Sequence, residues 1–208
     1  MEVFDKYFED YDQWYEDNKL IYLSELKAFK KVIPINKKGL EIGVGTGRFA
    51  EPLGIEYGVD PSEKMLSIAK KRGIKTFVGK GENLPFHDKE FDYVLLAITI
   101  CFVENPDKVI GEAGRVLKDN GKVIIGIIDK NSPLGKFYLE KKKEGHKFYK
   151  YATFYSTEEI VEMLKKHNFK DFIFYQTIFG TIKDIKEIEE PKEGYGEGSF
   201  VIISATKC

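Results

Sequence analysis

Cysteine and histidine are scarce in this chain of 208 residues, which has two cysteines and three histidines. Cys101 and Cys208 are too few to build a disulfide framework or a CxxC metal site. The three histidines, His87, His146 and His167, show no metal-ligand spacing among themselves, so we expect no metal site. Because no Ser-His-Asp or Cys-His constellation is readable either, no catalytic residue is assigned from the sequence.

Net charge and long apolar runs are also lacking. The chain has 33 Lys and Arg against 34 Asp and Glu, a net charge of −1, which argues against nucleic-acid binding through overall positive charge. The longest apolar runs, such as residues 94–98 and 123–128, have the length of strands and fall far short of a membrane span. Residues 1–11 are acidic and aromatic, unlike a signal peptide, so we expect a cytoplasmic protein without a membrane partner.

Hydrophobic residues are plentiful, at 42% of the chain, and aromatic residues make up 14%. A folded chain of this size hides roughly 70% of the surface that its unfolded form exposes, so a full core is available without disulfides. We expect residues 1–208 to form a single domain.

Hydrophobic periodicity predicts how the elements follow one another. Residues 3–31 have helical spacing, with a break near Asn18. Strands and helices then alternate: strands are expected at 40–44, 57–59, 75–78, 91–99 and 122–128, and helices at 46–53, 62–72 and 106–118. This rhythm predicts a parallel sheet wound with helices on both faces.

The last third of the chain has a different pattern. A capping box at Ser156 opens a helix to residue 167, and strands are expected at 171–179 and 199–205 with a long loop between them. Two strands joined without a helix predict an antiparallel pair at the edge of the sheet. The expected fold is therefore α/β, with a doubly wound, mainly parallel, seven-stranded Rossmann-like sheet and an antiparallel last strand.

A glycine-rich turn between the first strand and the next helix is the strongest chemical signal. Residues 39–49 read GLEIGVGTGRF, a GxGxG pattern followed by Arg48. The dinucleotide fingerprint is GxGxxG, so a dinucleotide oxidoreductase is the weakest of the alternatives. The acidic Glu41, two residues before the first glycine, would repel a pyrophosphate but could accept from a cationic ligand.

Two further stretches follow the next two strands. Asp60 ends the second strand, where an acidic side chain can accept both hydroxyls of a ribose. By itself, the Asp-Pro-Ser sequence at this position could equally be the start of a helix. Residues 79–86 read GKGENLPF, and their glycines would let a backbone amide face the edge of an adenine.

Together these stretches resemble a class I S-adenosylmethionine-dependent methyltransferase of the type 11 branch, which includes the ubiquinone- and menaquinone-pathway C-methyltransferases. The matching segments span about residues 39–129 and are ExGxGTGRF, GVDPSxxML, ENLPF, FDYV and RVLKxxG. The FYSTEEI segment from Phe154 resembles the late helix of the family. The aromatic N-terminal helix and the loop at residues 193–198 resemble a small bacterial group labelled histamine N-methyltransferase-like, but the residues leave the substrate open.

The resemblance implies S-adenosylmethionine as the cofactor and a cofactor site built from the strand ends. The residues implied are Glu41, Gly43, Val44, Gly45 and Gly47 near the methionine part, Asp60 at the ribose, Pro61, Met65, Gly81 and Glu82 near the adenine, and Ala97 and Ile98 on the methyl side. Lys80 departs from the family, because many relatives have an acidic adenine contact there and a lysine cannot accept. The adenine contact would then fall to Glu82 or to the backbone alone.

The methyl acceptor is expected to bind outside these motifs. Candidate acceptor-binding residues are aromatic, namely Tyr11, Trp14, Phe102, Tyr149 and Tyr195. We expect residues 1–33 to form a helical lid, 39–129 the cofactor-binding core, 131–155 an insertion on the substrate side, and 156–208 the last helix and edge strands. An aromatic helix face is also common in ordinary core packing, and that reading stays open for the N-terminal stripe. Glu104 and Asp129 follow strand ends and could reach an acceptor, or could be solvated or capping residues.

The expected function is methyl transfer to a small molecule, through a nitrogen, oxygen, sulfur or carbon atom, mainly by proximity and alignment. Two alternatives remain. The first is an S-adenosylmethionine-binding module without transfer activity. The second is an RNA methyltransferase, which the run of lysines at residues 136–150 would favour, although such a run is usually a solvated face. The sequence leaves the oligomeric state open.

Overall fold

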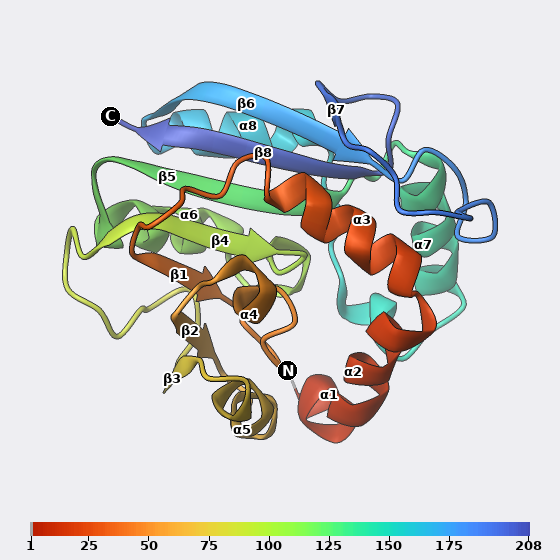
Figure 1. Ribbon diagram of the computed structural model, residues 1–208, viewed down its shortest axis with the longest axis horizontal. Helices are drawn as coiled ribbons and strands as arrows, with labels where there is room; N and C mark the ends of the chain where they lie inside the picture. Colours follow the sequence, from red (N-terminus) through yellow and green to blue (C-terminus); the bar gives the residue numbers. More distant parts are fainter. Residues whose placement is uncertain (1) are drawn as a thin grey trace.

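The computed structural model describes residues 2–208, which form one mixed sheet with helices on both faces (Figure 1). The strand order is β3-β2-β1-β4-β5-β8-β6-β7. The first five of these strands are parallel, and β8 runs antiparallel to both β5 and β6. The strand bounds are β1 Gly39–Ile42, β2 Tyr57–Asp60, β3 Lys75–Val78, β4 Phe91–Ala97, β5 Leu117–Ile128, β6 Phe169–Thr177, β7 Lys192–Glu193 and β8 Phe200–Lys207.

Eight α-helices and two short 3-10 helices connect the strands within the described residues. The α-helices are α1 Glu2–Lys6, α2 Phe8–Asp17, α3 Lys19–Phe29, α4 Ala50–Leu53, α5 Glu63–Lys71, α6 Pro106–Val116, α7 Pro133–Lys143 and α8 Thr157–Lys166. The 3-10 helices are η1 Ile100–Phe102 and η2 Tyr149–Tyr151. None of the helices in residues 2–208 is long and apolar enough to cross a membrane.

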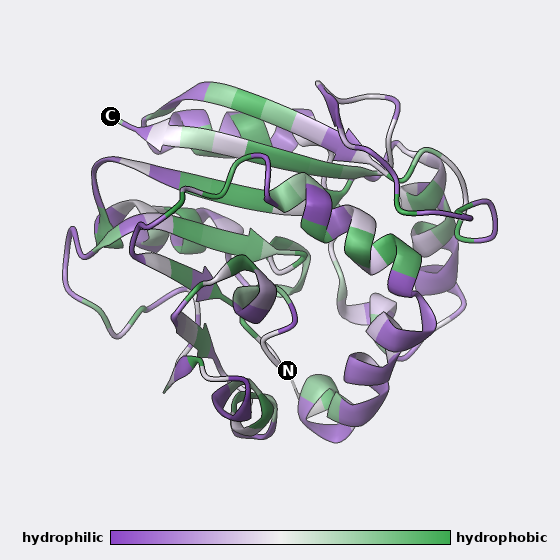
Figure 2. Ribbon diagram, viewed as in Figure 1, coloured by the Kyte–Doolittle hydropathy of each residue, from purple (hydrophilic) through white to green (hydrophobic). Residues whose placement is uncertain are grey.

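The sheet separates two hydrophobic cores. Helices α3, α4 and α5 cover one face, where the fully buried Phe29 packs edge to face on Phe49 and Phe200 at ring distances of 5.4 and 5.6 Å. Helices α6 and α8 cover the other face with residues such as Val109 and Ile160. Apart from Asp92 and Gly126, hydrophobic residues run unbroken along β4 and along residues 123–128 of β5, as expected of strands covered on both sides (Figure 2).

The predicted doubly wound sheet with an antiparallel last strand is confirmed, with two differences. There are eight strands instead of seven, because the two-residue strand β7 pairs with β6 inside the span expected to be a loop. The helix expected at residues 46–53 is only α4, since Gly43, Gly45 and Gly47 all have positive φ angles and keep the chain in a turn until residue 50.

The N-terminal segment, expected to be one helix with a single break, consists of three. It is interrupted at Tyr7 as well as at Asn18. Its parts also lie in different places: α3 is part of the core, whereas α1 and α2 lie beyond the sheet on the side toward which the arrowhead of β4 points (Figure 1). Tyr15 of α2 is nevertheless buried against the same core. Parallel strands present ligand sites at the sheet edge toward which they point.

Candidate active site

The glycine turn joins the end of β1 to α4 and has a backbone that ordinary residues rarely adopt. Gly43 has a φ of 71°, and a side chain there would collide with Thr99 at the end of β4. Gly45 has a φ of 52°, and the nearest atoms to the position of a Cβ are Met65 Sδ and Tyr11 Cε1, each at 3.7 Å. A Cβ at Gly45 would be in ordinary van der Waals contact with these two side chains, so the positive φ is what favours glycine there.

Asp60 lies beside this turn at the end of β2. Its side chain is nearly buried, with 8% exposed, and its two oxygens accept hydrogen bonds from Gly45 N at 3.0 Å and from Ser62 N at 2.9 Å. Burial raises the pKa of Asp60 to about 6, although these two hydrogen bonds act in the opposite direction. Ser62 in turn caps α5 by accepting from Met65 N, so the carboxyl group is held in one orientation.

A first cavity opens between the glycine turn, Asp60 and the end of β4. Most of the cofactor-binding residues predicted from the sequence line it, although they come from four different segments of the chain. Those lining it are Gly43, Gly45, Asp60, Pro61, Met65, Gly81, Glu82, Ala97 and Ile98, and two predicted acceptor-binding residues, Tyr11 and Phe102, line it as well.

Three predicted residues support the turn and do not line the cavity. Val44 packs into the core against Gly58, and Gly47 packs against Ile74. Glu41 is buried and receives a backbone hydrogen bond from Ala50, while its Oε2 has no partner within residues 2–208. Burial raises the pKa of Glu41 well above its ordinary value.

The end of the cavity near Gly81 is built by the loop after β3. The Oε1 atom of Glu82 accepts from the backbone N–H groups of Glu104 at 3.0 Å and Asn105 at 3.2 Å, next to the start of α6. Lys80 pairs with Glu104 at 2.8 Å on the surface. The Oε1 of Glu82 thus already accepts two hydrogen bonds from the protein, and Lys80 and Glu104 face each other. A Cβ on Gly81 would lie 2.9 Å from Ile42, so only glycine fits there.

Ile98, directly after β4, has an unusual backbone. Its φ is 57°, in the left-handed region that β-branched residues avoid. Its side chain lines the first cavity and a second one, and its carbonyl accepts a hydrogen bond from Cys101 Sγ at 3.2 Å. Strained backbone of this kind is concentrated at functional sites.

The second cavity adjoins the first and lies under the N-terminal helices. It has a volume of about 440 Å³ and shares five lining residues with the first, namely Phe4, Tyr11, Tyr15, Ile98 and Phe102. The predicted acceptor-binding residues Trp14 and Tyr149 line it too. Tyr149 comes from the segment expected to be a substrate-side insertion, and its ring stacks on Tyr138 at 4.4 Å.

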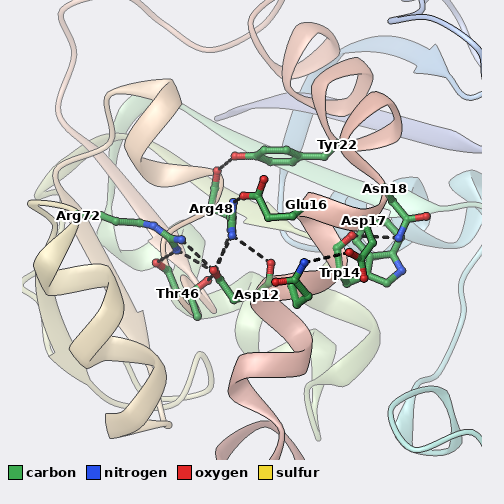
Figure 3. A network of polar contacts seen from close by, with 10 residues as sticks. Asp12, Trp14, Glu16, Asp17, Asn18, Tyr22, Thr46, Arg48 and Arg72 are labelled. Carbon is green, nitrogen blue, oxygen red and sulfur yellow. Dashed lines mark hydrogen bonds and ion pairs between the residues drawn. The ribbon is translucent and has the colours of Figure 1, made fainter.

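Polar contacts join helix α2 to the glycine turn (Figure 3). The Asp12 carboxylate accepts from Thr46 Oγ1 at 2.6 Å, from Arg48 Nε at 2.9 Å and from Arg72 at 3.0 Å. The hydroxyl of Tyr22 donates to the carbonyl of Arg48. The start of the chain and the turn therefore form one connected unit.

Tyr195 is not brought to either cavity. Its ring is 42% exposed and packs against Phe174 at 4.9 Å. The reason is that strand β7 pairs with β6, and the Gln176 side chain accepts from Glu197 N at 2.8 Å and Gly198 N at 2.7 Å, which holds the loop at the edge of the sheet. We leave Tyr195 out of the acceptor site.

Two other carboxylates considered from the sequence have structural partners. Asp129 accepts from both the N–H and the hydroxyl of Thr157, at 2.8 and 2.7 Å, and so fixes the start of α8. Glu104 pairs with Lys80, as described above. Neither lines either of the two cavities.

Sequence reasoning missed Glu25, which lines the second cavity from α3. Only 1% of it is exposed, and burial raises its pKa to about 8. A signal was present: Ile21, Glu25 and Ala28 have the i, i+4, i+7 spacing of one helix face, and the outer two are buried apolar residues. A carboxyl group in the middle of an apolar stripe is a buried polar group that needs an explanation.

Comparisons with known proteins agree with this geometry. Residues 40–125 match the sequence family described as a methyltransferase domain. The crystal structure of a SAM-dependent methyltransferase from Thermotoga maritima, described as a possible histamine N-methyltransferase, superposes with a TM-score of 0.96. It is 48% identical and covers 100% of this chain and 99% of that one. This chain belongs to the class I S-adenosylmethionine-dependent methyltransferases of the type 11 family.

Other relatives of this methyltransferase cover most of its length. An uncharacterized protein of Methanocaldococcus jannaschii is 56% identical over 207 residues, which span 100% of both chains. The demethylmenaquinone methyltransferase of Thermotoga maritima is 29% identical over 217 residues, covering 89% of this chain and 93% of that protein.

The cofactor of the family, S-adenosylmethionine, suits the residues of the first cavity. The cavity lining of this methyltransferase includes the side-chain-free backbone of Gly45 and the fixed carboxyl group of Asp60, whereas Glu41 is buried behind the turn. Gly45 allows a ligand to approach the backbone closely, and the oxygens of Asp60 suit a ligand that carries hydroxyl groups. Within residues 2–208 no group of three or more His, Cys, Asp or Glu could hold a metal ion.

Proposed function

We propose that this methyltransferase transfers the methyl group of S-adenosylmethionine to a small molecule that binds in the second cavity. The observation that carries the proposal is that the two cavities adjoin. They share five lining residues, namely Phe4, Tyr11, Tyr15, Ile98 and Phe102. A donor in the first cavity and an acceptor in the second would meet where the cavities adjoin. A space of about 440 Å³ is within the range of small-molecule sites.

In this proposal the residues of the first cavity bind and orient the cofactor. The Asp60 carboxylate, fixed by two backbone N–H groups, has lone pairs left for the ribose hydroxyls. Gly43 and Gly45 leave room for the methionine part, and Met65 and Pro61 pack near the adenine. When bound, S-adenosylmethionine supplies a methyl group already activated by a sulfonium.

The second contribution of the protein is a dry, aligned reaction space. Aromatic rings of Phe4, Tyr11 and Phe102 meet edge to face over the junction of the two cavities, with Phe4–Phe102 centroids 5.0 Å apart and Phe4–Tyr11 centroids 5.8 Å apart. These packed rings would exclude water from the place where the two cavities adjoin. Alignment alone can supply an effective molarity on the order of 10⁵ M, or about 7 kcal/mol, so the chemistry does not depend on a dedicated base.

An RNA acceptor is disfavoured by the contacts of the lysine run at residues 136–150. Lys141 pairs with Glu144 at 2.6 Å, Lys142 donates to a backbone carbonyl, and Lys147 pairs with Asp10. Three of the six lysines in this run therefore have partners inside the protein, and Glu140 and Glu144 dilute its positive charge. We place the acceptor among small molecules, with the attacking atom to be found by experiment.

The test is methyl transfer from radiolabelled S-adenosylmethionine to a panel of small amines, phenols, thiols and carbon acids, with histamine among the amines. We expect labelled product from at least one small molecule and none from total RNA. Transfer to RNA alone would overturn the proposal. A protein that binds S-adenosylhomocysteine but transfers to nothing in a broader metabolite extract would favour the non-catalytic binding module.

A further inference from the structure

The second cavity contains a buried carboxyl group to which no role has been assigned. Glu25 points from α3 into a space whose other interior walls are aromatic or aliphatic, including Tyr15, Ile21, Leu134 and Tyr138. Its Oε2 is buried and has no hydrogen-bond partner in the part of the chain that the structure describes. Leaving such a group unpaired costs about 1 to 3 kcal/mol, which a ligand donating a hydrogen bond would recover.

Two tyrosine hydroxyls of the cavity lining are engaged with each other, because those of Tyr11 and Tyr15 are 2.8 Å apart and share a hydrogen bond. The rings of Tyr138 and Tyr149 stack at 4.4 Å, and His146 stacks on Tyr149 at 4.5 Å. Glu25 thus lines a cavity rich in aromatic rings, and its Oε2 atom has no donor within residues 2–208.

The charges around the cavity favour a cation. Of its two basic lining residues, Lys147 pairs with Asp10, and burial together with nearby lysines lowers the pKa of His146. The acidic lining residues are Asp10, Asp17 and Glu25. Burial raises the pKa of Glu25 to about 8, so its carboxyl group is mostly protonated at neutral pH in the free protein. An amine that enters the aromatic cavity takes up this proton, and the resulting ammonium pairs with the carboxylate.

We propose that Glu25 is the specificity-determining residue of the acceptor cavity and that it binds the amino group of a small aromatic amine. This inference rests on the proposed function, since it names the acceptor class of the same site. An ammonium or amine donates the hydrogen bond that Oε2 lacks, and the ring faces of Trp14 and Tyr15 suit both the cation and an aromatic body. A neutral alcohol of the same shape would also donate a hydrogen bond but would gain neither ion pairing nor cation–π attraction.

The experiment compares matched pairs of probes on the protein saturated with S-adenosylhomocysteine. The pairs are benzylamine with benzyl alcohol, 2-phenylethylamine with 2-phenylethanol, and tryptamine with tryptophol, measured by calorimetry. We expect wild type to bind at least one amine tenfold or more tightly than its alcohol. In Glu25→Gln, which keeps the size but not the charge, we expect this preference to fall to about twofold or less.

Glu162→Gln is the matched control, because Glu162 is exposed on α8, which covers the other face of the sheet. We expect this variant to keep the full amine preference.

A wild-type protein that shows no preference in any pair, or a Glu25→Gln variant that keeps the preference, would overturn the inference. Binding of S-adenosylhomocysteine is measured first in each variant, so failure there would count against the proposed function and not against the acceptor class. If Glu25→Gln does not fold, Glu25→Asp replaces it as the test, because it keeps the carboxyl group on a shorter side chain. We expect Glu25→Asp to weaken amine binding at least fivefold and to leave alcohol binding within twofold. Unchanged amine binding in this variant would contradict the inference.

Discussion

The Asp12 carboxylate accepts a hydrogen bond from Arg48 Nε at 2.9 Å, and this contact ties helix α2 to the residue that follows the glycine turn. The same carboxylate accepts from Thr46 inside the turn and from Arg72 after α5 (Figure 3). One side chain therefore connects α2, which lines the acceptor cavity, both to the glycine turn that lines the cofactor cavity and to the C-terminal end of α5.

Replacing Asp12 with Asn should loosen this connection. Burial alone would raise the pKa of Asp12, but hydrogen bonds from Arg48, Arg72 and Thr46 outweigh it and hold the pKa well below its ordinary value of 3.8. We expect Asp12→Asn to cost about 1 to 3 kcal/mol of folding free energy, or roughly 3 to 10 °C in melting temperature. We expect S-adenosylhomocysteine binding to weaken only in part, with much of the affinity kept.

The pH dependence of this effect has a definite sign. A carboxylate whose pKa is lower in the folded protein than in the unfolded chain stabilises the folded state at any pH above its unfolded-state pKa. This stabilisation is lost as the pH falls from the unfolded-state pKa toward the folded-state pKa. The melting difference between wild type and Asp12→Asn should therefore be constant at neutral pH and shrink below about pH 4. Asp17→Asn is the control, since Asp17 accepts only an exposed contact from Gln13. A difference that grows in acid would contradict this role of Asp12.

A truncated protein tests whether helices α1 and α2 form a lid that the core does not need in order to fold. Removing residues 1–18 deletes α1 and α2 and leaves α3, whose Phe29 packs on Phe49 and Phe200. We expect the shortened protein to fold and to keep much of its affinity for S-adenosylhomocysteine, but to lose methyl transfer because the junction is open to water.

Removing residues 1–29 is the comparison for that truncation. It deletes buried residues of α3, including Phe29, and should prevent stable folding, because losing one buried Phe alone costs about 3 to 5 kcal/mol. Circular dichroism melts and transfer assays distinguish the two shortened proteins. Full transfer activity after removal of residues 1–18 would show that α1 and α2 are not a lid.

Glu25→Gln should stabilise the protein without ligand, increasingly so as the pH rises. The pKa of Glu25 is raised from 4.5 to about 8 by burial, so the folded state binds more protons than the unfolded state between these values. Wild type then loses stability at about 1.4 kcal/mol per pH unit as the pH rises through this window, whereas the Gln variant does not.

The measurement is a series of melts of wild type and Glu25→Gln between pH 5 and pH 8. The variant should gain roughly 3 to 6 °C on wild type for each pH unit. Glu162→Gln should follow wild type throughout, because its carboxylate is exposed. A difference between wild type and Glu25→Gln that does not change with pH would mean that Glu25 is ionised or solvated in the folded protein.

The sequence predicted the wound sheet and most of the cofactor cavity because both depend on local patterns. The turn that holds Gly43 and Gly45, and Asp60 at the end of β2, are short motifs whose neighbours in space follow from the parallel order of the strands. The five parallel strands were expected for the same reason, since each is a short apolar run between turn residues.

The acceptor cavity was less predictable because it is assembled from residues far apart in the chain. Tyr149 meets Tyr138 and faces the N-terminal helices only after η2 folds back on α7, a tertiary relationship with no local pattern. Tyr195 was expected there as one of the aromatic residues outside the cofactor motifs, but pairing of β7 with β6 holds it elsewhere. Glu25 was overlooked because a glutamate in a helix is normally solvated, and only burial of its helix face makes it unusual.

The central claim is that the first cavity binds the cofactor through Asp60, and calorimetry with S-adenosylhomocysteine tests it most directly. We expect wild type to bind with micromolar affinity, on the order of −8 kcal/mol. Asp60→Ala should bind about 1 to 3 kcal/mol more weakly, because the ribose hydroxyls lose their acceptor. Asp119→Ala, at an exposed pair with Lys89, should match wild type. No binding by folded wild type, equal binding by Asp60→Ala, or displacement by NAD would contradict the account.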